Sequence, residues 1–214
     1  MKCRFLCVIV LFVLLSAWIT PVEAETVSSV GFDAEALDAY ISGQMSKHGI
    51  RGISLAVTSK TEIVYLKGYG TAGGGRPMTP RTPMYIGSQS KSFTGLAIAQ
   101  LIEQGLVSQG DPVQKHIPWF RVADEAASAQ ITVGHLLHHT SGLSEAGFVV
   151  SLPADASNED AVRALVSAEL TAPVGSTFQY FNVGYDVLAV IVQNVSGMKY
   201  EDYIQKFIFD PLEM

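Results

Sequence analysis

The sequence contains very little cysteine. Cys3 and Cys7 are the only two among its 214 residues, and both lie within the first seven positions. That segment has the layout of a secretory signal that is removed, so the mature chain is expected to contain no cysteine. An exported chain of this kind has no disulfide to stabilise it, and packing alone must hold its fold.

Charged residues are also scarce, at 16% of the chain, and acidic residues outnumber basic ones by 20 to 14. No basic run is longer than a pair, which excludes the electrostatic footprint of a nucleic-acid-binding protein. The G-x-x-x-x-G-K-[ST] phosphate-binding pattern is absent too, so the glycines at 73–75, followed by Pro77, Pro80 and Pro83, are expected to form a loop. The chain is instead 48% hydrophobic, which is enough for the sizeable core of a single domain.

The N-terminus has the three parts of a secretory signal. Lys2 and Arg4 precede an apolar run at residues 5–19, and small residues at 22–24 suit a signal peptidase. We therefore predict a signal peptide at 1–24 and export to the periplasm, the cell envelope or the extracellular space. The alternative is an uncleaved anchor, although the apolar run is shorter than the roughly 20 residues that span a bilayer.

The order of hydrophobic patterns predicts one helix, a hairpin and then several helices. Asp33 is suited to cap the first helix, and residues 53–70 have the β-branched composition of two strands joined at 59–61. Further helices are predicted from Ser88 to Gly105, from Thr132 to about 141, over 157–170, from Asn182 to Gly197 and over 200–209. Two strands are few for so many helices, because a lone hairpin is marginally stable.

A serine and a lysine stand one helical turn apart in the stretch IGSQSKSFTG at 86–95. Ser88 and Lys91 would share one face of a helix, and a serine hydroxyl becomes a good nucleophile only when a base takes its proton. A lysine can take that proton when burial lowers its pKa from the usual value of about 10.4. The simpler interpretation is a serine N-cap beside a solvated lysine. The same spacing recurs at Ser196 and Lys199, where we attribute it to chance because Ser196 ends a helix.

A second cluster, at 178–189, adds two groups suited to this chemistry. Tyr180 can relay a proton through its phenol, and the amide of Asn182 can hold both a lysine and a substrate amide. Each also has a structural interpretation, since Tyr180 can be a packing residue and Asn182 a helix N-cap.

Longer stretches follow one another in a specific order. They are GYG at 68–70, TPMYIGSQSKSFTGLAIAQLIEQG at 82–105, ITVGHLLHHTSGL at 131–143, FQYFNVGYDVLA at 178–189 and IFDPLEM at 208–214. Together they resemble the serine β-lactamase and penicillin-binding protein superfamily, and most of all its class C-like branch, which also holds D-amino-acid peptidases and esterases. The resemblance covers about residues 33–214.

The resemblance implies an α+β fold of the β-lactamase/transpeptidase type, with an antiparallel sheet flanked by helices and a helical subdomain. It implies that Ser88 is the nucleophile, Lys91 its activating partner and Tyr180 a second proton-transfer residue. Asn182 would orient Lys91 and the substrate. The substrates of such a hydrolase are D-amino-acid peptides, β-lactams or small esters, and it needs no metal or other cofactor.

The sequence departs from the family in one important respect. The family's third motif, Lys-Thr-Gly or His-x-Gly, lies on a strand after the IFDPLEM-like segment, and no such motif follows here. We therefore expect residues 25–214 to be the incomplete N-terminal portion of the catalytic domain, with C-terminal strands missing and the chain inactive alone. A membrane attachment beyond Met214 and the oligomeric state are left open.

Two other functions compete with the serine hydrolase. One is a non-catalytic relative that binds penicillin or cell-wall peptide. The other is a metal-dependent hydrolase that uses His135, His138 and His139, although no glutamate follows His135 and no further ligand is evident.

Overall fold

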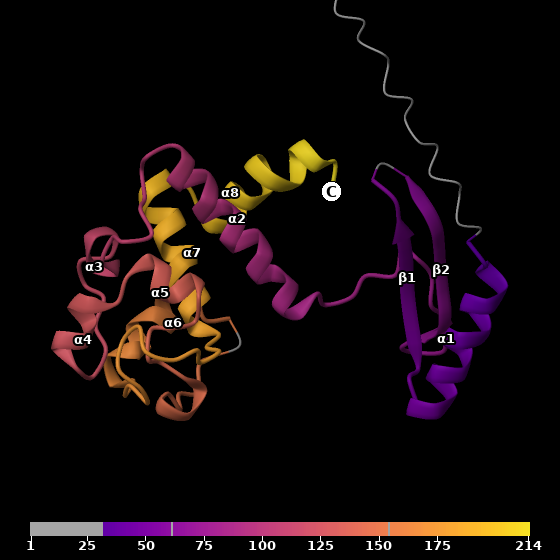
Figure 1. The fold of residues 1–214 in the computed structure, drawn as a ribbon, viewed down its shortest axis with the longest axis horizontal. Helices are drawn as coiled ribbons and strands as arrows, with labels where there is room; N and C mark the ends of the chain where they lie inside the picture. Colours follow the sequence, from indigo (N-terminus) through magenta and orange to yellow (C-terminus); the bar gives the residue numbers. More distant parts are fainter. Residues whose placement is uncertain (1–31, 61, 154) are drawn as a thin grey trace, which may run out of the picture. The chain divides into compact units, whose positions relative to one another are not determined.

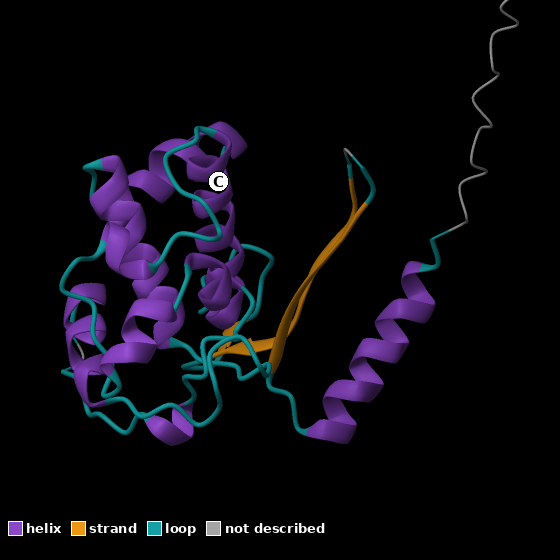
Figure 2. Ribbon diagram, turned by 60° about the vertical axis from the view of Figure 1, so that its left-hand side comes forward, coloured by secondary structure: helices purple, strands orange, loops and turns teal. Residues whose placement is uncertain are grey.

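The computed structural model describes residues 32–214, except 61 and 154. The expected signal segment, residues 1–24, lies outside the described residues. Within them the chain divides after Met84 into two compact units, one holding the strands and one made of helices and loops (Figure 2).

The first unit consists of one helix and an antiparallel sheet in the order β1-β2-β3 (Figure 1). Its elements are α1 (Ala34–His48), β1 (Gly52–Thr58), β2 (Ile63–Ala72) and β3 (Arg76–Pro77). Among the described strands β1 pairs with β2 alone, and β3 meets β2 only at Thr71 and Ala72. The outer edge of β1 and most of the opposite edge of β2 therefore have no neighbouring strand in the described part of the chain.

Helix α1 is tied to β2 by a cluster of polar side chains. Asp38 forms an ion pair with Lys67 at 2.5 Å and accepts hydrogen bonds from the hydroxyls of Tyr69, at 2.6 Å, and Tyr65. Lys67 and then the two tyrosines lower the pKa of the Asp38 carboxyl to about 2. This cluster connects the helix to the sheet in a unit that buries little apolar surface.

The GYG stretch is explained by close approach of the backbone. A Cβ atom on Gly68 would lie 2.2 Å from the carbonyl oxygen of Met78, a distance that no side chain tolerates. Gly70 has a φ of +71°, a left-handed conformation that glycine adopts without strain. Both positions therefore require glycine for physical reasons.

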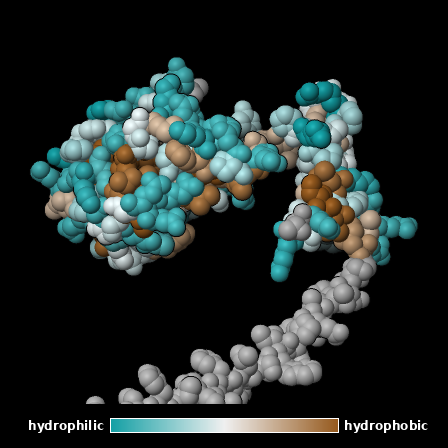
Figure 3. Space-filling view, turned by 90° about the horizontal axis from the view of Figure 1, so that it is seen from above, coloured by the Kyte–Doolittle hydropathy of each residue, from teal (hydrophilic) through white to brown (hydrophobic). Residues whose placement is uncertain are grey.

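Large hydrophobic side chains remain at the surface of the first unit. Figure 3 shows a brown, hydrophobic area on the surface of this unit. The exposed large hydrophobic residues of this unit are Phe32, Tyr40, Ile50, Ile63, Val64, Leu66 and Met84. Among the described residues of this unit, only Tyr69 and Ala72 are apolar and buried.

The second unit, which begins at Tyr85, contains helices α2 to α8. They are α2 (Ser90–Glu103), α3 (Val113–His116), α4 (Glu125–Gln130), α5 (Val133–Leu137), α6 (Asn158–Ala164), α7 (Val183–Ser196) and α8 (Tyr200–Ile204). Short 3-10 turns lie at Gly87–Gln89, Glu145–Gly147, Leu165–Ser167 and Asp210–Leu212, and a π turn at Gln205–Phe209 follows α8.

Helix α7 is the centre of this unit and contacts α2, α5, α6 and α8 (Figure 1). Its residues from Val187 to Val192 are all buried, and Phe120, Leu136 and Leu165 are among the largest side chains packed in the same core. Removing this much apolar surface from water is the main source of stability for the unit.

The small antiparallel sheet and many helices confirm the predicted α+β class. Several predicted bounds were wrong. Arg76 and Pro77 form a short strand where a loop was expected, the predicted helix at 157–170 ends its α-helical part at Ala164, and the helix at Thr132 ends at Leu137. In α2, Leu96 is exposed.

No helix among the described residues is both long and apolar enough to cross a membrane.

Candidate active site

Ser88 lies in the 3-10 turn Gly87–Gln89, just before α2, and its side chain is exposed. The preceding Gly87 has a φ of +54°, which lets the chain bend sharply into the turn. Lys91 follows in the first turn of α2, and its Nζ donates a hydrogen bond to Ser88 Oγ at 3.3 Å. The predicted one-turn relation between the two side chains is therefore present.

Tyr180 approaches the same serine from a loop 92 residues further on. Its hydroxyl lies 2.5 Å from Ser88 Oγ, and either oxygen can donate the hydrogen. Lys91 Nζ lies 4.8 Å from the centroid of the Tyr180 ring. The Lys91 ammonium, and then the Ser88 hydroxyl, lower the pKa of the Tyr180 phenol. These contacts favour the phenolate, the form that can accept a proton.

Asn182 completes the group of four predicted residues. Its Oδ1 accepts a hydrogen bond from Lys91 Nζ at 2.7 Å. Although Asn182 occupies the N-cap position of α7, its side chain makes no hydrogen bond to that helix. Of the two interpretations drawn from the sequence, the structure therefore supports contact with Lys91 and not capping of its own helix.

Two further residues hold these groups in place: Glu145, which sequence reasoning missed, and His139, which it considered only as a metal ligand. Glu145 Oε1 accepts hydrogen bonds from the backbone N of Asn182 and from its Nδ2. The ring of His139 lies 4.6 Å from that of Tyr180, and His139 Nδ1 accepts a hydrogen bond from the backbone N of Phe181 at 3.3 Å. Both residues lie in or just after the quoted stretch 131–143, and that proximity was the only available signal.

Two of the three histidines of the predicted metal alternative have separate roles in the structure. His135 Nδ1 accepts a hydrogen bond from the backbone N of Thr132 in a capping box, while the His139 ring packs on Tyr180. Within residues 32–214 apart from the two gaps, no group of three His, Cys, Asp or Glu side chains is placed to hold a metal ion.

A hollow of about 270 Å³ lies behind Lys91 and Asn182. Asp186 and Tyr200 also line it, and the Tyr200 hydroxyl pairs with Thr94 Oγ1 at 2.7 Å. Burial raises the pKa of the Asp186 carboxyl to about 6, and the nearby Lys91 opposes that shift. Sequence reasoning did not identify this carboxyl.

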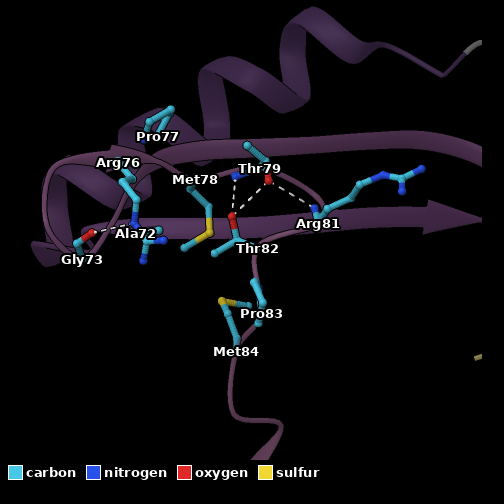
Figure 4. Close-up of a pocket in the computed structure, with 10 residues that line it drawn as sticks. All are labelled: Ala72, Gly73, Arg76, Pro77, Met78, Thr79, Arg81, Thr82, Pro83 and Met84. Carbon is cyan, nitrogen blue, oxygen red and sulfur yellow. Dashed lines mark hydrogen bonds between the residues drawn. The ribbon is translucent and has the colours of Figure 1, made fainter.

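A larger hollow lies away from this site. It has a volume of about 530 Å³, lies entirely within the first unit and is lined by residues 72–84 (Figure 4). Its polar contacts are those of a turn, in which the backbone N of Thr79 donates to Thr82 Oγ1 at 2.9 Å. The hollow contains no nucleophile with a neighbouring base, so we assign it no chemistry and favour the smaller site on chemical grounds.

The four predicted residues together have the parts needed for nucleophilic catalysis. A hydroxyl lies within hydrogen-bond distance of both an amine and a phenol, and a side-chain amide holds the amine. Such an arrangement can transfer a proton away from the hydroxyl and give one back to a leaving group.

Comparison with known proteins gives a consistent result. The Beta-lactamase family model matches residues 37–214. Protein flp of Staphylococcus aureus (strain MW2) is 33% identical over 193 residues, which cover 84% of this chain and 37% of flp. The chain thus spans little more than a third of that relative's length.

Two solved structures extend the comparison. The octameric penicillin-binding protein homologue from Pyrococcus abyssi superimposes with a TM-score of 0.72 and 35% identity, over 85% of this chain and 43% of that one. The D-amino acid amidase from Ochrobactrum anthropi SV3, solved in complex with D-phenylalanine, gives a TM-score of 0.71 and 27% identity, over 84% and 51%. These likenesses support the β-lactamase/transpeptidase type of fold predicted from the sequence.

Proposed function

The chain belongs to the beta-lactamase family, and from that membership we propose that it is part of a serine hydrolase that works through an acyl-enzyme on Ser88. The observation that carries the proposal is the position of Ser88 Oγ, 3.3 Å from Lys91 Nζ and 2.5 Å from the Tyr180 hydroxyl. A serine with two proton-transfer groups at this range is prepared for nucleophilic attack.

In the proposed reaction, Ser88 Oγ attacks the carbonyl carbon of the substrate while its proton passes to the Tyr180 phenolate, or to Lys91 in its neutral amine form. The tetrahedral intermediate then expels an amine or alcohol, which takes that proton as it leaves. Water attacks the resulting ester, releases the acid and restores the serine hydroxyl. Asn182 holds Lys91 beside Ser88 throughout.

The proposed substrates are D-amino-acid peptides or amides, β-lactams and small esters. All three present a carbonyl carbon with a leaving group that needs a proton. The likeness to a D-amino acid amidase supports the first class, and the likeness to a penicillin-binding protein homologue supports the second.

The proposal is tested by covalent labelling with a fluorophosphonate and a fluorescent penicillin, in a purified version of the protein that also carries the third motif. We expect the label on Ser88, and we expect Ser88→Ala to lower labelling by roughly 10³-fold or more, as for other catalytic nucleophiles. Ser196→Ala is the matched control, because Ser196 and Lys199 have the same spacing but Ser196 Oγ only accepts a hydrogen bond from the backbone N of Met198.

Each competing function gives a different result. Labelling without release of product would indicate the non-catalytic penicillin-binding alternative. Full labelling of Ser88→Ala would contradict the assignment of the nucleophile, and hydrolysis abolished by a chelator would favour the metal-dependent alternative.

A further inference from the structure

A carboxylate lies directly behind the candidate active site. Glu145 begins the 3-10 turn Glu145–Gly147 and lies 37 residues before Asn182 in the sequence. Its Oε1 accepts two hydrogen bonds from Asn182, one from the backbone N at 3.0 Å and one from Nδ2 at 2.9 Å. The two residues are therefore connected at both the main chain and the side chain.

The Asn182 amide is held between opposite charges. Its Oδ1 faces the Lys91 ammonium at 2.7 Å, and its Nδ2 faces the Glu145 carboxylate. An ammonium only donates hydrogen bonds and an ionised carboxylate only accepts them, so each end of the amide has one compatible neighbour. If the Asn182 amide were turned by 180°, its Nδ2 donor would face the Lys91 donor and its Oδ1 acceptor would face the Glu145 acceptor.

Glu145 also stands at the N-terminus of α7, where its charge suits the helix dipole. Asn182 does not cap this helix with its own side chain, and Glu145 accepts the backbone hydrogen at that position instead. A role in helix stability alone is therefore the rival explanation that an experiment must separate.

We propose that Glu145 is a positioning residue for the reaction proposed at Ser88. By fixing the Asn182 amide, it keeps Oδ1 turned toward Lys91, and Lys91 Nζ stays beside Ser88 Oγ. The effect of Glu145 on the reaction rate rests on the proposed function. The contact between Glu145 and Asn182 does not, and it can be tested separately.

The test measures the rate at which a fluorophosphonate phosphonylates Ser88, a reaction in which Ser88 Oγ attacks phosphorus and fluoride leaves. Glu145→Ala should react about tenfold more slowly or worse, because a hydrogen bond to a charged group is lost. Glu145→Gln keeps an acceptor oxygen and should stay within about threefold of the wild type. Glu125→Ala, an exposed glutamate of α4, is the matched control and should react at the wild-type rate.

A double-mutant cycle shows whether Glu145 acts through Asn182. The variant with both Glu145→Ala and Asn182→Ala should be no slower than Asn182→Ala alone, because residues that act as a unit are not additive. An equal slowing by Glu145→Ala in both backgrounds would overturn the inference. A wild-type rate in Glu145→Ala with a lowered melting temperature would also overturn it, since that result fits a helix cap only.

A second variant and a second measurement keep the inference testable in every case. Glu145→Met, which has similar length but no carboxylate, replaces Glu145→Ala if that variant does not fold. If the wild-type protein is not phosphonylated at Ser88, the proposed function fails, and the contact is then read from the NMR signals of the Asn182 Nδ2 hydrogens. They should shift in Glu145→Ala or Glu145→Met, which have no acceptor oxygen at this position, but not in Glu145→Gln, and unshifted signals in Glu145→Ala or Glu145→Met would overturn the inference.

Discussion

The position of Tyr180 depends on a strained residue. His139 is one of only two described residues other than glycine with a positive φ, at 55°. Such a conformation costs of order 1–3 kcal/mol and persists only when the surroundings enforce it. Here the backbone oxygen of His139 accepts a hydrogen bond from Gln179 N at 2.7 Å, and its ring packs against Tyr180. The strain therefore lies beside the candidate site, where it fixes the loop that carries the phenol.

At the same scale, the half-buried carboxyl of Asp186 should make stability depend on pH. Burial raises its pKa from 3.8 to about 6, so the folded state binds this proton more tightly than the unfolded state. The stability contribution is complete below about pH 3.8 and is lost as pH rises through about 6.

Asp186→Asn should therefore stabilise the protein at pH 8 and have little effect at pH 4. A shift of this size corresponds to roughly 3 kcal/mol, which we reduce to about 1–2 kcal/mol because water and Lys91 reach the carboxyl. Urea unfolding at both pH values measures the difference, with the exposed Asp202→Asn as control. Equal effects of Asp186→Asn at the two pH values would contradict the argument.

At the scale of elements, the sheet depends on close approach between β2 and the segment after β3. Gly68→Ala would place a methyl group 2.2 Å from the Met78 carbonyl oxygen and 2.6 Å from Thr79 Cα, both of which are backbone atoms. We expect a loss of roughly 1–3 kcal/mol or more in the local stability of the sheet, because backbone cannot move aside as a side chain does. Hydrogen exchange of the amides at 52–72 should become faster.

Gly43→Ala is the matched control for this substitution. Gly43 lies within α1, and nothing lies within 4 Å of a Cβ built on it. Alanine should stabilise the helix there by roughly 0.5–1 kcal/mol. Unchanged exchange of the sheet amides in Gly68→Ala would show that the neighbouring backbone yields.

Elements with strong local signals were predicted well, and those set by distant contacts were not. Asp33 caps α1 through a hydrogen bond to the backbone N of Ala36, and Gly197 ends α7 in a left-handed conformation, as the sequence indicated. The 3-10 turn at Ser88 and the short strand β3 have no such signal. Pairing with β2 decides β3, and hydrophobic periodicity carries no information about it.

The candidate site follows the same rule. Ser88 with Lys91, and Tyr180 with Asn182, are short local patterns, so the sequence and its resemblance predicted all four, and the structure brings them together. Glu145 was missed because its importance depends on a contact across 37 residues, in a loop without periodic pattern.

At the scale of the whole molecule, stability is divided unevenly. Among the described residues, nearly all buried apolar side chains belong to the second unit, around α7. The first unit relies on a hairpin, a short third strand and the polar cluster around Asp38. Small sheets are marginally stable, so local unfolding of this unit should cost less free energy than local unfolding of the second unit.

The open rim of the sheet has a consequence for how the chain behaves in solution. The outer side of β1 presents backbone donors and acceptors without partners among the described strands, and the exposed Ile63, Val64 and Leu66 lie on β2, the strand paired with β1. Such a rim is a template for a strand from another molecule. We expect concentration-dependent self-association, and Ala56→Lys, which puts a charge at an exposed position of β1, should reduce it. Sedimentation velocity would show the effect, and a monomer at all concentrations would mean that the rim is already protected.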